Sequence, residues 1–168
     1  MGEKLDIYDE NRIKTGRIIN RNEGEYISKN EYVLAIQCWV INKNKEILLT
    51  QRKLDKIGGG IWEPTSGLVQ SGENSIQGVK RELREEIGIE VEDKDLKLFK
   101  TVIDEKAIRD IYVMNKEISI KSIKFNDGEV INAKYVTIKQ LEEMIDKGKA
   151  FDWLRWFLKD YNIIVNER

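Results

Sequence analysis

The chain has 168 residues, 40% hydrophobic and 35% charged, a composition typical of one globular domain over residues 1–168 that buries its own core. Because 29 basic side chains face 30 acidic ones, the net charge of −1 excludes the general basic excess of many nucleic-acid-binding proteins. No apolar run reaches membrane-spanning length, and the absence of histidine removes the commonest acid–base residue and the commonest zinc ligand.

The single cysteine, Cys38, lies in the middle of an apolar stretch and has no second cysteine for an internal disulfide. We therefore expect a core residue rather than a nucleophile, and a reducing cytoplasm as the location. The charged N-terminal sequence MGEKLDIYDENR lacks an apolar signal region. Neither a nucleic-acid partner nor a membrane is expected, whereas the sequence leaves open whether two copies form a homodimer.

The first half of the chain is predicted to consist of short strands. β-Branched and aromatic residues alternate with turn sequences in this half. The pattern predicts a hairpin of 6–8 with 14–19, a loop at 20–31, a strand at 33–41, an antiparallel return at 46–52, a loop at 53–60, and a short strand and loop at 61–68.

The second half of the chain is predicted to mix helices and strands. A helix is expected at 74–87, followed by strands at 96–103, 107–115 and 117–125, a turn at 126–128, a strand at 133–138, and helices at 138–147 and 151–161. Strands on both sides of one central helix, with helices at the end, indicate an α+β fold with a central mixed sheet and helices on its faces.

The helix at 74–87 carries two different faces. At about 100° per residue, Ile76, Val79, Leu83 and Ile87 form one compact apolar stripe, and Gly88 follows where a left-handed residue ends a helix. Packing therefore explains the aliphatic residues and the glycine.

Packing does not explain the acids on the second face of this helix. Glu82, Glu85 and Glu86 lie at i, i+3 and i+4, where like charges repel and the nearby helix C-terminus adds to the repulsion. A hard divalent cation such as Mg²⁺, which prefers carboxylate oxygens and bridges to substrate phosphates, would remove the conflict. The alternative is an ordinary solvated acidic face.

The stretch from Gly67 to Ile89 resembles the Nudix box, G-x5-E-x7-R-E-U-x-E-E-x-G-U, in which U is aliphatic. The constrained positions are filled, at the right spacing, by Gly67, Glu73, Arg81, Glu82, Leu83, Glu85, Glu86, Gly88 and Ile89. The resemblance implies an αβα sandwich and the hydrolysis of a diphosphate linkage in a small-molecule substrate with Mg²⁺ or Mn²⁺ as cofactor.

The resemblance also implies roles for the box residues. Glu82, Glu85 and Glu86 would be metal ligands, and one of these acids would serve as the base. Arg81 and Glu73 would form an orienting pair behind the ligands. Gly67 would let the loop pass close to the helix and the metal.

The sequence around the box resembles the branch related to isopentenyl-diphosphate isomerase, which shares the fold but shifts a double bond. That enzyme needs a cysteine before the box glycine and several metal-binding histidines, whereas this chain has Ser66 before Gly67, Leu68 after it, and no histidine. A hydrolase is therefore the preferred interpretation. A second alternative is a Nudix-fold module that binds a nucleotide without cutting it.

Residues outside the box complete the set of candidates. Arg52, at the end of a strand, is a candidate for binding a substrate phosphate or else an exposed cation. Glu129 lies where many family members place a further metal-binding or catalytic acid in a late loop, and it is grouped here with the substrate-binding residues. Three tryptophans are more typical of core or cleft-wall positions than of base stacking, although one of them, or Tyr112, remains a candidate for stacking on a nucleobase: Trp62, Trp153 and Trp156.

Overall fold

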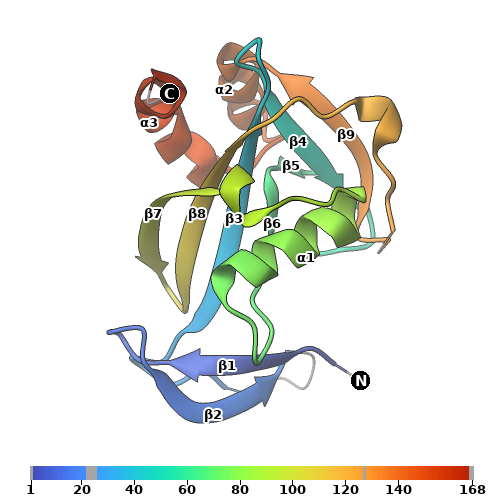
Figure 1. The fold of residues 1–168 in the computed structure, drawn as a ribbon. Helices are drawn as coiled ribbons and strands as arrows, with labels where there is room; N and C mark the ends of the chain where they lie inside the picture. Colours follow the sequence, from blue (N-terminus) through green and yellow to red (C-terminus); the bar gives the residue numbers. More distant parts are fainter. Residues whose placement is uncertain (1, 22–25, 127, 167–168) are drawn as a thin grey trace.

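The computed structural model describes residues 2–21, 26–126 and 128–166. Within these residues, a mixed sheet lies between α1 (Ser75–Ile87) on one face and α2 (Ile138–Asp146) with α3 (Arg155–Asn166) on the other (Figure 1). A separate two-stranded sheet of β1 (Lys4–Tyr8) and β2 (Lys14–Asn20) lies at one end of the sandwich. This is the α+β sandwich expected from the order of elements.

The main sheet is built around one parallel pair of strands. Its order is β5-β4-β3-β8-β7, with β6 paired to β3 and β9 paired to β4, and only β3 and β8 run parallel among the described pairs. The strands are β3 (Val33–Ile41), β4 (Ile47–Arg52), β5 (Trp62–Glu63), β6 (Thr65–Leu68), β7 (Lys97–Asp104), β8 (Ala107–Asn115) and β9 (Val130–Val136). Single 3₁₀ turns occur at Asp93–Asp95, Ile120–Ser122 and Asp152–Leu154.

Each face of the sheet carries its own apolar core. On the α1 face, Val79 and Leu83 pack with Cys38 of β3. On the other face, Trp39 of β3 stacks on Phe157 of α3. Because successive side chains of a strand point to opposite faces, β3 serves both cores and all nine of its residues are buried. No helix in the described part of the chain is long and apolar enough to cross a membrane.

Most elements lie where the sequence predicts them, and one prediction is wrong. Residues 117–125 form a loop with one 3₁₀ turn instead of a strand. β9 already pairs along β4, and the loop is held by single contacts, such as the Ile118 N–H donating to the Tyr135 hydroxyl at 3.0 Å. Within the loop predicted at 20–31, residues 22–25 lie outside the described residues, as does residue 127 of the turn predicted at 126–128.

An ion pair between the partly exposed Arg12 and the buried Asp110 fastens the β1–β2 hairpin to the main sheet. In the hairpin turn, Arg12 donates from both terminal nitrogens to Asp110 of β8, and Thr101 of β7 donates to the same carboxylate at 2.7 Å. Burial opposes the ionisation of Asp110, but the hydrogen bonds from Arg12 and Thr101 outweigh it and hold the pKa of this carboxyl below its usual range.

We expect Asp110→Asn to lower the free energy of unfolding at pH 7 by about 1.5 kcal/mol, because it weakens the charge-assisted hydrogen bonds that a buried carboxylate accepts from Arg12 and Thr101. An aspartate with a lowered folded-state pKa stabilises the fold above its unfolded-state pKa, and this stabilisation is lost as the pH falls through the folded-state value. Urea denaturation should therefore show the gap between wild type and variant closing below about pH 4. A gap that stays constant from pH 7 to pH 3 would contradict the assignment.

Candidate functional site

The N-terminal and C-terminal caps fix where α1 begins and ends. The Asn74 side chain accepts from the Gln77 N–H at 2.9 Å, and the Gln77 side chain accepts from the Asn74 N–H at 2.8 Å, which completes a capping box. Gly88 ends the helix at φ 70°, in the left-handed region. The aliphatic stripe packs on the sheet, and Arg81 on another face of the helix contacts Leu68 and Glu73 of the segment that precedes it.

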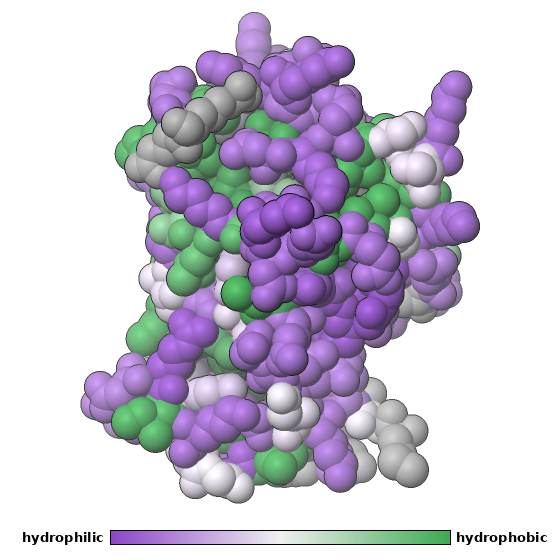
Figure 2. Space-filling model, viewed as in Figure 1, coloured by the Kyte–Doolittle hydropathy of each residue, from purple (hydrophilic) through white to green (hydrophobic). Residues whose placement is uncertain are grey.

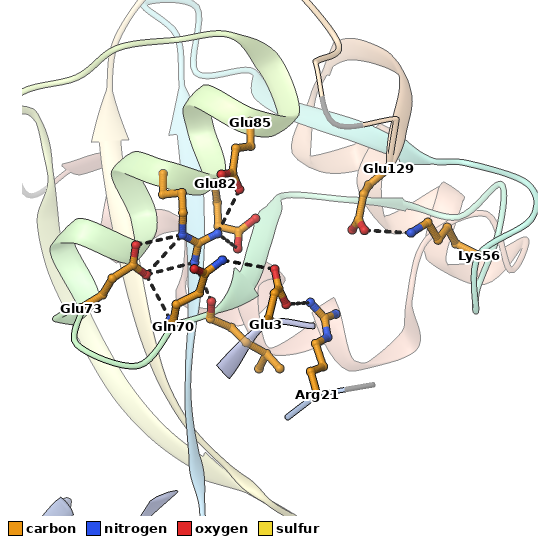
Figure 3. Close-up of polar contacts among 10 residues, drawn as sticks. Glu3, Arg21, Lys56, Gln70, Glu73, Glu82, Glu85 and Glu129 are labelled. Atoms are coloured by element: carbon orange, nitrogen blue, oxygen red, sulfur yellow. Dashed lines mark hydrogen bonds and ion pairs between the residues drawn. The ribbon is translucent and has the colours of Figure 1, made fainter. Parts of the chain in front are cut away.

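Arg81 lies at the centre of these acids (Figure 3). Its Nε donates to Glu73 at 2.9 Å, and its Nη1 donates to Glu82 at 2.8 Å and to Glu85 at 3.0 Å. Its Nη2 donates to the Leu68 carbonyl at 2.8 Å, which ties the helix to the end of β6. One guanidinium thus links three box carboxylates and the preceding strand.

The burial of this cluster perturbs its proton equilibria. Burial raises the pKa of Glu82 to about 7, although the neighbouring charge of Arg81 opposes the rise. Burial also disfavours the charge of Arg81, but the hydrogen bonds to Glu73 and the charge of Glu82 hold the pKa of Arg81 above its usual range. The arginine therefore stays charged, while Glu82 is poised to gain or lose a proton near neutral pH.

Gly67 is the point of closest approach between β6 and the helix. A Cβ atom built at this position would lie 2.1 Å from the Glu82 Oε1 atom and 2.2 Å from its carboxyl carbon. Only the missing side chain lets the strand pass over the Glu82 carboxylate. This close approach therefore requires glycine at position 67.

The donor set fits a hard divalent cation. Glu82 and Glu86 are each 8% exposed, whereas the Glu85 side chain is 41% exposed, so buried and accessible carboxylates occupy adjoining positions of one helix. Carboxylate oxygens are the ligands that Mg²⁺ and Mn²⁺ prefer. Within the described ranges, no three acidic side chains form a ready-made cage, because Glu82 and Glu85 turn toward Arg81.

A cleft of about 520 Å³ brings together Arg52 and Glu129, the two candidate residues outside the box. The cleft is also lined by Gly2, Glu3, Arg21, Lys56 and Ile57. Figure 3 shows the Glu3–Arg21 pair near the acids of α1 and the Glu129–Lys56 pair further away, and Gln70 joins Glu3 to the box loop at 3.4 Å. On the face that carries α1, the surface is mostly hydrophilic (Figure 2).

The sequence does not predict the residues that surround Arg52 and Glu129. Glu63 is 6% exposed and accepts from Arg52 at 2.6 Å, and Lys56 donates to Glu129 at 2.8 Å. The sequence signal for Glu63 is its position as a charged residue in a short strand, directly before Pro64. If such an acid is buried, it needs a cation nearby. The contribution of Arg21 depends on the docking of the hairpin and has no local signature.

Two of the candidates for base stacking, Trp62 and Tyr112, lie in the core, whereas Trp153 is 42% exposed. Trp62 is 9% exposed and packs beneath the Lys134 ammonium, and Tyr112 is 3% exposed and hydrogen-bonds to Ser75 at 2.6 Å. Among the described residues that line the cleft, none is aromatic. These two rings therefore act as packing residues here.

Comparison with known families settles the relationship that the box suggests. The model of the NUDIX domain matches residues 31–157. The chain belongs to the Nudix family. Among curated proteins, this Nudix chain is 28% identical to an uncharacterised Nudix hydrolase of Listeria monocytogenes, over 88% of this chain and 87% of that protein. It is also 28% identical to an isopentenyl-diphosphate Delta-isomerase of Klebsiella pneumoniae, over 71% of this chain and 67% of that protein.

Solved structures agree on the Nudix fold. The protein DR0079 of Deinococcus radiodurans superposes with a TM-score of 0.73 at 20% identity, covering 88% of this chain and 91% of that one. The NUDIX domain of NrtR from Shewanella oneidensis, solved in complex with ADP ribose, superposes with a TM-score of 0.60 at 18% identity, covering 74% of this chain and 83% of that one.

We expect Gly67→Ala to weaken the affinity for Mn²⁺ by about tenfold or more, because the new methyl group displaces the Glu82 carboxylate. Electron paramagnetic resonance of free Mn²⁺ during a titration measures the change. A urea melt of the variant, carried out in parallel, separates displacement of the acid from loss of the fold. Wild-type affinity in a folded variant would contradict the expectation that Glu82 is a metal ligand.

Proposed function

We propose that this Nudix hydrolase cleaves a diphosphate linkage in a nucleoside diphosphate derivative, with Mg²⁺ or Mn²⁺ as cofactor. The single observation that carries the proposal is the set of carboxylates gathered on Arg81 beside a cleft with three cations. An acidic helix face next to a cationic cleft is the arrangement that a metal-bound diphosphate needs, since it offers ligands to the metal and counter-charges to the phosphates.

The residues of the box would have separate roles in metal binding and in proton transfer. Glu82, Glu85 and Glu86 would hold the cation, with Gly67 giving the strand room beside them. A divalent cation in such a site neutralises phosphate charge and lowers the pKa of an attacking water. Glu82 or Glu85 would accept the proton from that water.

Arg81 and Glu73 act from behind the ligands. Their ion pair fixes the guanidinium, which in turn holds two of the acids in place. In the cleft, Arg52 would bind a substrate phosphate and Glu129 would contribute to the substrate-side contacts. The ADP ribose bound by the NrtR domain supports a nucleotide derivative as the substrate class.

The missing isomerase residues support hydrolysis over isomerisation. Ser66, Gly67 and Leu68 occupy the segment in which the resembled isomerase carries its cysteine and histidine, and the chain contains no histidine. The one cysteine, Cys38, is fully buried, and burial raises the pKa of its thiol to about 12, which makes it unreactive. A lone buried thiol also supports the cytoplasm as the location.

The test of the function is a substrate panel with Mg²⁺. Nucleotide sugars, nucleoside di- and triphosphates and isopentenyl diphosphate are each incubated with the protein, and phosphate-containing products and isomer formation are followed together. We expect hydrolysis of at least one nucleoside diphosphate derivative. Isomer formation without hydrolysis would establish the isomerase alternative, and tight binding without turnover would establish the nucleotide-binding module.

We expect Glu86→Gln to reduce turnover of the hydrolysed substrate by about a hundredfold or more at saturating Mg²⁺, because it removes a metal-binding charge at nearly constant size. Glu90→Gln is the matched control: this acid follows the same helix, is largely exposed, and lies 4.0 Å from the Arg84 guanidinium. The control should keep its rate within about twofold of wild type. Full turnover by Glu86→Gln would remove this residue from the ligand set.

A further inference from the structure

The β1–β2 hairpin borders the loop that carries the box from β6 into α1. Residues 1–30 lie outside the match to the NUDIX domain, yet Leu5, Ile7 and Ile19 of the hairpin pack on Val33 and Ala35 of β3 in one buried cluster. Figure 1 shows the loop before α1 reaching down to β1. The hairpin is therefore placed against a segment of the box itself.

The contact between the two is a specific set of hydrogen bonds. The Ser71 N–H donates to the Lys4 carbonyl at 2.7 Å, and the Ser71 hydroxyl donates to the Asp6 carboxylate at 2.8 Å. The other oxygen of Asp6 accepts from the Gly72 N–H at 3.2 Å. The Asp6 side chain is only 12% exposed, so its hydrogen bond with Ser71 is partly sheltered from water.

The same loop determines where Glu73 lies. Its carboxylate accepts from the Gln70 N–H at 3.0 Å, and its own N–H donates to the Gln70 carbonyl at 3.0 Å. Between these two residues the chain turns through Gly72, at φ 91°. A shift of the loop would therefore carry the Glu73 carboxylate with it.

The Glu73 carboxylate accepts a hydrogen bond from the Arg81 Nε–H at 2.9 Å, and Arg81 also donates to Glu82 and Glu85. We propose that Asp6 is a positioning residue for the reaction: through Ser71 and Gly72 it holds the loop whose Glu73 orients Arg81 and the metal-binding acids. This inference rests on the proposed function. The β1–β2 hairpin, although it lies outside the matched domain, would then help to position the residues of the site.

Asp6 also has a partner that does not belong to the loop. Lys14 of β2 donates to Asp6 at 2.6 Å, and its side chain is 49% exposed. Because the cation of this pair is half exposed, the pair contributes little to stability. Removal of Lys14 therefore separates the role of Asp6 within the hairpin from its role at the loop.

The kinetic test compares Asp6→Ala, Ser71→Ala and the conservative Ser71→Thr, with Lys14→Met as the matched control. We expect kcat to fall about tenfold in Asp6→Ala with KM within about twofold of wild type, because the reacting groups and not the substrate contacts are displaced. Ser71→Ala should lower kcat in the same way, Ser71→Thr should restore it, and Lys14→Met should keep it.

The structural test does not depend on turnover. In ¹⁵N-labelled protein, the Arg81 Nε–H should exchange slowly with solvent because it is bonded to Glu73, and its exchange should speed up about tenfold in Asp6→Ala and Ser71→Ala but not in Lys14→Met. A urea melt establishes that each variant is folded, and if Asp6→Ala does not fold, Ser71→Ala alone decides.

Unchanged exchange at Arg81 in the folded loop variants would overturn the proposal, whatever happens to kcat. A rise in KM at constant kcat would overturn it as well, since Asp6 would then act on substrate binding. If wild type hydrolyses no diphosphate in the panel, the proposed function fails, and the exchange data alone decide whether Asp6 positions Arg81.

Discussion

The arrangement of this site depends on one buried guanidinium. Arg81 is 7% exposed, and a cation taken out of water at this depth is costly unless it is fully paired. Glu73, Glu82 and Glu85 supply the pairing, and the Leu68 carbonyl takes the remaining donor. The fold around the box can be understood as the means of bringing these acceptors to one point.

That solution leaves an electrostatic imbalance. More carboxylates than guanidinium groups gather at this point, and burial raises the pKa of Glu82 to about 7 although the charge of Arg81 opposes the rise. Under the proposed function, a divalent cation would add the positive charge that this excess of acids favours. Arg81 would keep Glu82 and Glu85 close enough together to act as ligands.

The sequence predicted the parts of the site that are local along the chain. Helix spacing and the box place Glu82, Glu85 and Glu86 on α1, and the capping residues set its ends, because both depend on residues fewer than about ten positions apart. The wrong strand at 117–125 has a local cause too: apolar and polar residues alternate there as in a strand, but β9 is the segment that pairs along β4.

The rest of the site could not be predicted, because it consists of contacts between distant segments. Asp6 meets Ser71, and Arg12 meets Asp110, across separations that no periodicity records. Arg21 enters the cleft only because the hairpin docks on β3. Charged residues of this kind look like ordinary surface positions in the sequence, and only the fold shows which of them share a site.

The cleft contains cations that are already paired. Each of the three cations that line the cleft has a carboxylate partner: Arg21 pairs with Glu3, Arg52 with Glu63, and Lys56 with Glu129. The pairs of Arg21 and Lys56 are partly exposed on both sides and are each worth about 1 kcal/mol or less, so a phosphate with its higher charge can replace Glu3 or Glu129 at little cost, whereas the buried Glu63 keeps Arg52 in place. The pairing holds each cation near the cleft before substrate arrives, which reduces the side-chain entropy lost on binding. Under the proposed function, the acids released by this exchange would lie beside a metal-bound diphosphate, where their charge can interact with the cation.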